Sequence, residues 1–73
     1  MISLSSVKKG QTFKVTSIPG SEVRAQAIRF GIAEGSTLEC EEKVPAGPII
    51  VRKNNQEIAI GRTLAKSIQV VVL

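Results

Sequence analysis

Apolar and polar positions alternate in several short segments of this chain. In residues 11–18, Phe13 and Val15 alternate with polar neighbours, which is the two-residue period of a strand with one buried face. Pro19 and Gly20 follow, and they end the segment because proline lacks a backbone donor and glycine admits positive φ. The first strand is therefore predicted over residues 11–18.

The apolar period changes to that of a helix after this strand. Ser21 is a candidate N-cap, and Val23, Ala27 and Phe30 then recur at intervals of four and three residues. Ile28 widens the stripe that these three side chains form. We predict a helix of about ten residues whose apolar stripe, Phe30 included, faces the core.

Two glycines mark the end of this helix. Gly31 suits the left-handed C′ position, and Ile32 follows where such a cap makes its apolar contact. Gly35, preceded by Glu34, suits a turn that leads into the next strand. The segment thus predicts a capped helix followed by a tight turn.

Alternation returns over residues 36–44. Leu38, Cys40 and Val44 are predicted to face the core, with charged residues between them facing solvent, although Glu42 interrupts the pattern. We expect Cys40 to pack as a small apolar side chain, since unpaired cysteine is usually buried and unreactive.

A β-hairpin is predicted further along. Residues 49–53 are rich in β-branched side chains, Asn54-Asn55 tolerates the backbone of a two-residue turn, and residues 57–60 return as a strand. Residues 61–67 suffice for one helical or 3₁₀ turn, and residues 68–72 form a last strand.

These elements predict a mainly β fold in one domain, residues 1–73. About five short antiparallel strands, a short helix after the first strand and a helical turn before the last favour a small SH3-like barrel, with an OB-fold as the alternative. Seventy-three residues are too few for a second core.

Composition argues against catalysis. The chain has no histidine and one cysteine, so it lacks the usual bases, an internal disulfide and the side chains that borderline metals prefer. The acidic cluster of Glu39, Glu41 and Glu42 is split between the two faces of its strand. We therefore expect no enzyme activity, no cofactor and no metal site.

Two alternative functions remain open, one of which is suggested by the net charge of +4. Nucleic acid is not expected as a partner, because Trp and Tyr are absent and both Phe are predicted in the core. The alternative is a small basic barrel that binds nucleic acid through dispersed cations, Lys8, Lys9, Lys14, Arg52, Lys53 and Arg62. A second alternative is a structural module that self-associates through a strand edge.

The apolar runs are far shorter than the roughly 20 residues of a membrane span. The N-terminal lysines follow the apolar residues, the reverse of a secretory signal. A cytoplasmic location is therefore expected.

The order of these features resembles the FeoA family, ferrous iron transport protein A, over essentially the whole chain. The resemblance is carried by Leu4, Gly10, the segment VRAQAIRFGIAEG and the segment VPAGPIIVRKNNQEIAIGRTLAKSIQV. A leucine-glycine-leucine-x-proline-glycine segment is typical after the helix in that family. Its places are taken here by Phe30, Gly31, Ile32 and Gly35, with Glu34 where proline is common.

The resemblance implies an SH3-like barrel that is a cytosolic accessory of ferrous iron uptake. Its partner would be FeoB, the membrane permease with a GTPase domain, so that the chain lies at the inner face of the membrane through its partner. The family is often associated with transition metal binding, but no residue here matches such a site. The helix and its following loop would present Arg24, Arg29, Ile32 and Glu34 to the partner; the alternative is that both arginines are merely solvated.

Overall fold

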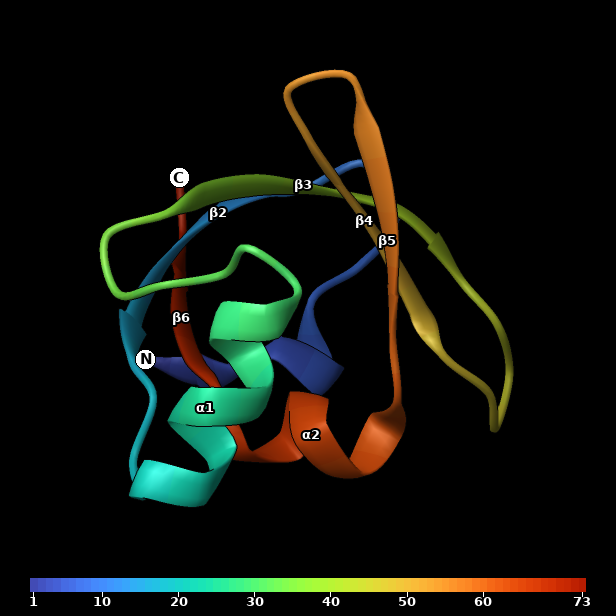
Figure 1. Ribbon diagram of the computed structural model, residues 1–73. Helices are drawn as coiled ribbons and strands as arrows, with labels where there is room; N and C mark the ends of the chain where they lie inside the picture. The colour runs from blue at the N-terminus through green and yellow to red at the C-terminus, as the bar shows by residue number, and fades with distance from the viewer.

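Six strands form one antiparallel sheet in the order β1-β6-β2-β3-β4-β5 (Figure 1). The computed structural model describes all residues, 1–73. In chain order the elements are β1 (Ile2–Ser3), the 3₁₀ turn η1 (Leu4–Ser6), β2 (Thr12–Ser17), α1 (Ser21–Arg29), β3 (Thr37–Lys43), β4 (Ile49–Lys53), β5 (Gln56–Ile60), α2 (Arg62–Ser67) and β6 (Gln69–Val72). This is the mainly β, SH3-like fold that the sequence predicts.

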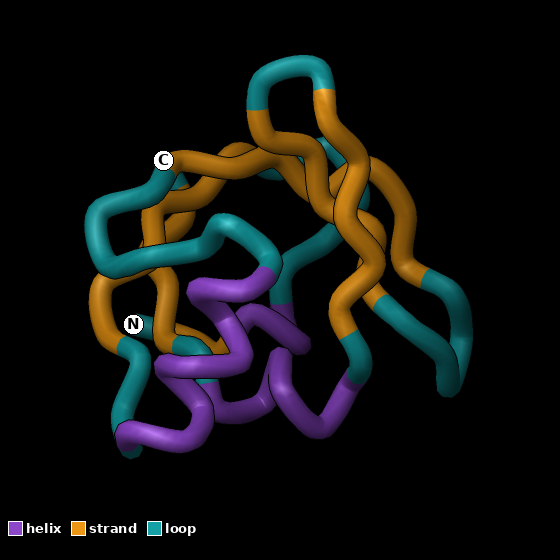
Figure 2. Tube along the Cα trace, viewed as in Figure 1, coloured by secondary structure: helices purple, strands orange, loops and turns teal.

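The sheet curves around the two helices. In Figure 2 the strands form an arc, and α1 and α2 lie next to each other on its concave side. The 3₁₀ turn η1 packs against α2. The hairpin of β4 and β5 projects beyond the arc at the end away from α2 (Figure 1).

The core is entirely apolar. Its sixteen buried side chains include no polar or charged group. Phe13 and Val15 of β2 and Leu38 and Cys40 of β3 are among them, as the alternation predicts. Any polar chemistry of this protein therefore takes place at its surface.

The predicted strands, the hairpin and both helices are confirmed, but one strand was missed. β1 has only two residues, too few to show a period, and it pairs with β6 at Ile2↔Val70. The hairpin loop is the predicted Asn54-Asn55 pair, in which Asn54 adopts a φ of 57°.

The predicted end of α1 is confirmed in detail. Gly31 has a φ of 77°, its N–H donates to the carbonyl of Ile28, and the N–H of Ile32 donates to the carbonyl of Ala27, both at 2.9 Å. These are the two hydrogen bonds of a Schellman cap. The predicted N-cap is wrong: Gly20 occupies that position, with a φ of 86° and no side-chain cap.

The predicted apolar stripe of α1 is only partly buried. Ala27 is buried and Val23 packs against the core, whereas Ile28 is 60% exposed and Phe30 is 43% exposed. Ile28 lies about 100° around the helix from Ala27, so it does not share the buried direction of Ala27. Phe30 is the C-cap, where the chain leaves the helix. Placing Phe30 in the core was wrong.

The interruption at Glu42 reflects a β-bulge. The register of β3 with β4 shifts between Cys40 and Glu42, so one extra residue enters β3 there. The extra residue reverses which positions of the strand face the core, so the alternation of buried and exposed residues before the bulge does not continue beyond it. Val44, predicted to face inward, is consequently 39% exposed.

Candidate partner-binding site

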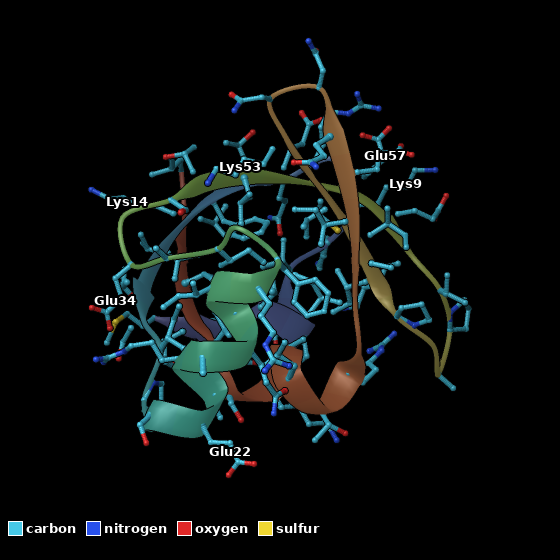
Figure 3. All side chains as sticks on the ribbon, viewed as in Figure 1. Lys9, Lys14, Glu22, Glu34, Lys53 and Glu57 are labelled. Carbon is cyan, nitrogen blue, oxygen red and sulfur yellow. The ribbon has the colours of Figure 1, made fainter.

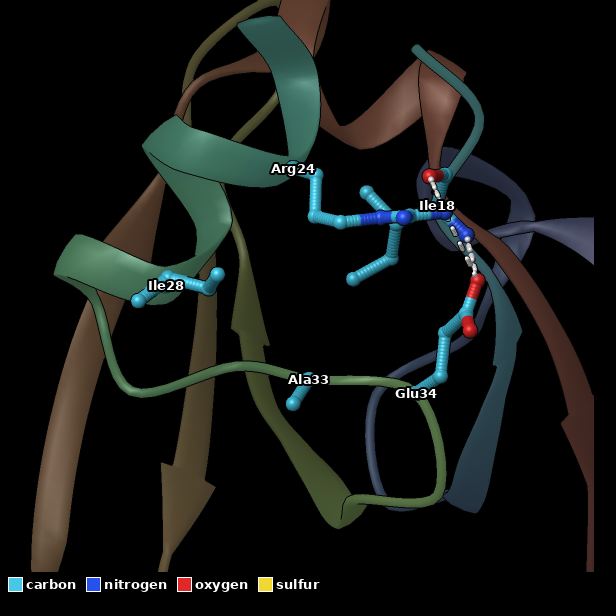
Figure 4. Close-up of a pocket in the computed structure, with 5 residues that line it drawn as sticks. All are labelled: Ile18, Arg24, Ile28, Ala33 and Glu34. Carbon is cyan, nitrogen blue, oxygen red and sulfur yellow. Dashed lines mark hydrogen bonds and ion pairs between the residues drawn. The ribbon is translucent and has the colours of Figure 1, made fainter. Parts of the chain in front are cut away.

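A pocket of about 260 Å³ opens between α1, the end of β2 and the loop after α1 (Figure 4). Three of its lining side chains are apolar, and the other two carry opposite charges. The lining residues are Ile18, Arg24, Ile28, Ala33 and Glu34. The pocket therefore combines an apolar wall with one cation and one anion.

Arg24 and Glu34 both bind the backbone of Ile18, as the dashed lines in Figure 4 show. The Ile18 N–H donates to Glu34 Oε2 at 3.0 Å, and Arg24 Nη2 donates to the Ile18 carbonyl at 3.3 Å. Arg24 Nη2 lies 3.6 Å from Glu34 Oε2. About half of each side chain is exposed, so solvent screens the pair and its main effect is to position the loop against the end of β2.

The four residues predicted to bind a partner occupy different places. Arg24 and Glu34 line the pocket together. Arg29, the last residue of α1, is exposed but does not line the pocket. Ile32 is fully buried and supports the loop from beneath. The role of all four in binding stays a prediction.

Sequence reasoning missed the apolar wall of the pocket. Ile18 was predicted simply as the end of a strand, and Ile28 was assigned to the core. One signal was available in the sequence. Ile28 directly follows Ala27, and when Ala27 faces the core of a short helix, the next residue faces a different direction. No signal in the sequence pointed to Ala33.

The β4–β5 hairpin is tied to the end of α1. Lys53 Nζ donates to the Gly31 carbonyl at 2.6 Å, close to the negative end of the helix dipole. This contact connects β4 to the loop that carries Ala33 and Glu34. The pocket is thus built on three anchored segments rather than on a free loop.

A second group of charges lies on the side of the molecule away from Glu34, around Lys9 and Glu57 (Figure 3). Arg52 contacts both Glu41, at 2.5 Å, and Glu57, at 3.3 Å. Lys9 Nζ lies 3.3 Å from Glu42. These glutamates are therefore directed at cations, and no three acidic or cysteine side chains gather as a cluster that could hold a metal ion.

Cys40 is a packing residue. The residue is 1% exposed, and burial raises the pKa of its thiol above the ordinary value. The thiol therefore stays protonated at neutral pH, and the protonated form is a poor nucleophile. The burial of Cys40 confirms the prediction that it packs as a small apolar side chain.

The Arg52–Glu41 pair predicts a pH-dependent contribution to stability. The hydrogen bond from Arg52 lowers the pKa of Glu41 below its ordinary value of 4.5. A carboxyl group with a lowered folded-state pKa stabilises the fold above its unfolded pKa, and this contribution is lost as the pH falls through the folded pKa. Glu41→Gln should therefore lower the urea midpoint at pH 7, and the gap to the wild type should close below pH 4.

Glu22→Gln is the control for loss of one negative charge, since Glu22 forms no ion pair. Its gap to the wild type at pH 7 should be the smaller of the two. A gap for Glu41→Gln that stays constant from pH 7 to pH 3 would contradict the assignment.

The family model for the FeoA domain matches residues 2–72. This chain belongs to the FeoA family. A crystal structure of the iron uptake regulatory protein FeoA superposes on this FeoA domain with a TM-score of 0.91 and 32% identity, covering 99% of this chain and 97% of that one. An NMR structure of a FeoA-like protein from Clostridium acetobutylicum gives a TM-score of 0.87 and 32% identity, covering 99% and 86%. The resemblance predicted from sequence is confirmed.

The same fold occurs within a larger regulator. The structure of the manganese regulator SloR matches this FeoA domain with a TM-score of 0.88 and 14% identity, covering 99% of this chain and 34% of that one. At that identity the likeness concerns the fold alone. No curated protein sequence matches the domain. Neither helix has the length and apolar character needed to cross a membrane.

Proposed function

We propose that this FeoA domain is a cytoplasmic accessory of ferrous iron uptake that docks on a FeoB-type transporter through the pocket beside α1. It acts by binding and carries out no reaction of its own. Membership of the FeoA family supports the part in ferrous iron transport. Docking on the membrane permease would hold the domain at the inner face of the membrane.

The observation that carries the choice of surface is the pocket itself. An apolar side chain of the partner could contact Ile28, while Arg24 and Glu34 offer a cation and an anion at the edge of the pocket. Ile18 lines the pocket but is fully buried. Ile28 and Phe30 are large apolar side chains exposed on one short segment. Exposed apolar groups beside arginine are typical of surfaces that bind other proteins.

Ile28→Asp tests this surface. Ile28 is 60% exposed, so aspartate at this position should leave the fold intact while placing an unpaired charge against an apolar partner group. We expect co-purification with the transporter to fall by roughly tenfold or more, the size of effect expected for a central interface residue. Pull-down from detergent-solubilised membranes, with a thermal melt of each variant, measures both properties.

Charge reversal extends the test to the arginines. Arg24→Glu combined with Arg29→Glu should also weaken co-purification. Lys8→Glu combined with Lys14→Glu is the matched control, because both lysines are exposed and lie outside the pocket. Unchanged binding by folded Ile28→Asp and by the folded double arginine variant would exclude this surface. If only the arginine variant loses binding, the partner contacts the charges of α1 and not Ile28, because Arg24 itself lines the pocket.

The nucleic-acid alternative receives less support from the positions of the basic side chains. Arg52 and Lys9 pair with glutamates, while Lys53 and Arg62 donate to backbone carbonyls. Of the six cations that this alternative requires, only Lys8 and Lys14 have no such partner. A titration with nucleic acid at two salt concentrations tests the alternative, because phosphate contacts weaken steeply with salt.

A further inference from the structure

One edge of the sheet is unprotected. The sheet ends in β1 on one side and in β5 on the other. β1 has two residues, and short edge strands are one way in which proteins avoid pairing with other chains. β5 has five residues, no proline, no lysine and no shift in its register with β4.

The hydrogen bonds of Cys40 fix which residues of β4 face β5. The Cys40 N–H donates to the Gln11 carbonyl at 2.9 Å and the Cys40 carbonyl accepts from the Gly10 N–H at 2.8 Å, so the backbone groups of Cys40 point toward β2. The backbone groups of its neighbour Glu39 therefore point toward β4, where Glu39 is paired with Arg52. The backbone groups of consecutive residues in a strand point to opposite sides. Those of Arg52 bond to β3, so those of Val51 and Lys53 point toward β5.

The same alternation identifies the free groups of β5. Lys53 faces Gln56 across the two-residue loop, and Val51 faces Ile58. Gln56, Ile58 and Ile60 consequently bond to β4, whereas the backbone groups of Glu57 and Ala59 point outward. Both residues are exposed, and no hydrogen bond outside the sheet involves their backbone. The edge thus presents the N–H and the carbonyl of Glu57 and those of Ala59, with Ile58 between the two residues.

We propose that β5 is a self-association site at which a second copy of this chain pairs with it antiparallel, about a two-fold axis at Ile58. In this register Glu57 of each copy lies opposite Ala59 of the other. Residues that face each other with outward-pointing backbone groups exchange two hydrogen bonds, so the two pairs form four. All four free groups of each edge are then used.

Other two-fold registers fit less well. Pairing centred on Glu57 sets two carboxylates opposite each other, which is destabilising. Pairing centred on Ala59 places Glu57 opposite Gly61, whose carbonyl already accepts a hydrogen bond from Ala65. The register centred on Ile58 avoids both problems, since Glu57 meets a methyl group and its carboxylate stays bonded to Arg52 at 3.3 Å.

A second copy fits this edge better than an unrelated strand because the free groups are arranged symmetrically about Ile58. Two identical edges therefore complement each other without any adjustment. Only about four hydrogen bonds and a narrow strip of surface are gained, so the association is weak, with a Kd on the order of 0.1–1 mM. β5 contributes no residue to the pocket beside α1, so the inference is independent of the proposed function.

Ala59→Pro tests the pairing directly. Proline removes a donor that points outward and leaves the bonds between β4 and β5 in place, which is the position where edge strands tolerate it. The substitution removes one hydrogen bond donated by each copy. Sedimentation equilibrium up to about 1 mM should therefore show a Kd of self-association raised by roughly tenfold. Ala59→Ser is the control, because it keeps the N–H and should change the Kd by less than about twofold.

A second pair of variants keeps every backbone donor. Ala59→Glu places a carboxylate opposite Glu57 of the second copy and should weaken association, with recovery at high salt. Ala59→Gln, of the same size, should associate more strongly than the Glu variant at low salt. Thermal melts of each variant show that the fold is kept.

Amide hydrogen exchange locates the contact in the unaltered chain. Protection of the Glu57 and Ala59 amides should rise with protein concentration, while that of Ile58, already bonded to β4, should not. A chain that stays monomeric up to about 1 mM would overturn the proposal. Association that is unchanged by both Ala59→Pro and Ala59→Glu, without protection of the Glu57 and Ala59 amides, would overturn it as well.

Discussion

Phe13→Ala is expected to remove a large fraction of the stability of this protein. Phe13 is the largest fully buried side chain, and truncating a buried phenylalanine typically costs about 3–5 kcal/mol. A 73-residue domain has a total stability of only about 4–11 kcal/mol. The variant should therefore lose more than ~10 °C of melting temperature, as circular dichroism melts and urea titration would measure.

Phe30→Ala is the matched control, since these are the only two aromatic residues of the chain. Phe30 is 43% exposed and lies outside the buried core, so its truncation should cost about 1 kcal/mol or less. Equal losses for the two variants would contradict the assignment of Phe13 to the core and Phe30 to the surface.

The two phenylalanines illustrate how far the fold could be predicted. Phe13 lies within a strand whose period of two residues leaves only two possible faces, so its burial followed from its neighbours. Phe30 lies at the end of a helix, where a periodic pattern does not show whether the sheet still lies beneath it. The difference between them depends on where the helix ends relative to the sheet, which is a tertiary property.

The bulge in β3 marks a similar limit. The charge at Glu42 signalled that alternation fails there, but a sequence does not reveal whether a strand ends or gains an extra residue. The register with β4 decides this, and β4 is fixed by its own hairpin with β5. Short-range turn signals at Asn54-Asn55 and Gly31 were reliable because their backbone geometry is set by one or two residues.

The candidate site was predictable only in its charged part. Arg24 and Glu34 stood out as charged residues on a helix and on its following loop. Their meeting at Ile18 required the end of β2 to lie between them, which no pattern in the sequence specifies. The apolar wall was missed because Ile18 and Ile28 belong to segments whose apolar residues are mostly core residues.

The second large effect is expected at Ile32, where stability and binding can be separated. Ile32→Ala removes a fully buried side chain directly after the helix cap and should cost about 2–5 kcal/mol. Because the N–H of Ile32 still bonds to the Ala27 carbonyl, α1 should keep its end, and the loss should arise from the cavity beneath the loop. Urea titration measures the cost.

Ile28→Ala distinguishes packing from binding at the same helix. Ile28 is 60% exposed, so its truncation should cost less than about 1 kcal/mol yet remove an apolar group from the pocket. If the pocket binds the transporter, Ile28→Ala lowers co-purification while the urea midpoint changes little. Ile32→Ala should do the reverse at temperatures where it remains folded, because its side chain is inaccessible to a partner. Loss of binding in folded Ile32→Ala with full binding by Ile28→Ala would place the contact on the loop instead, since only the loop depends on Ile32 for its position.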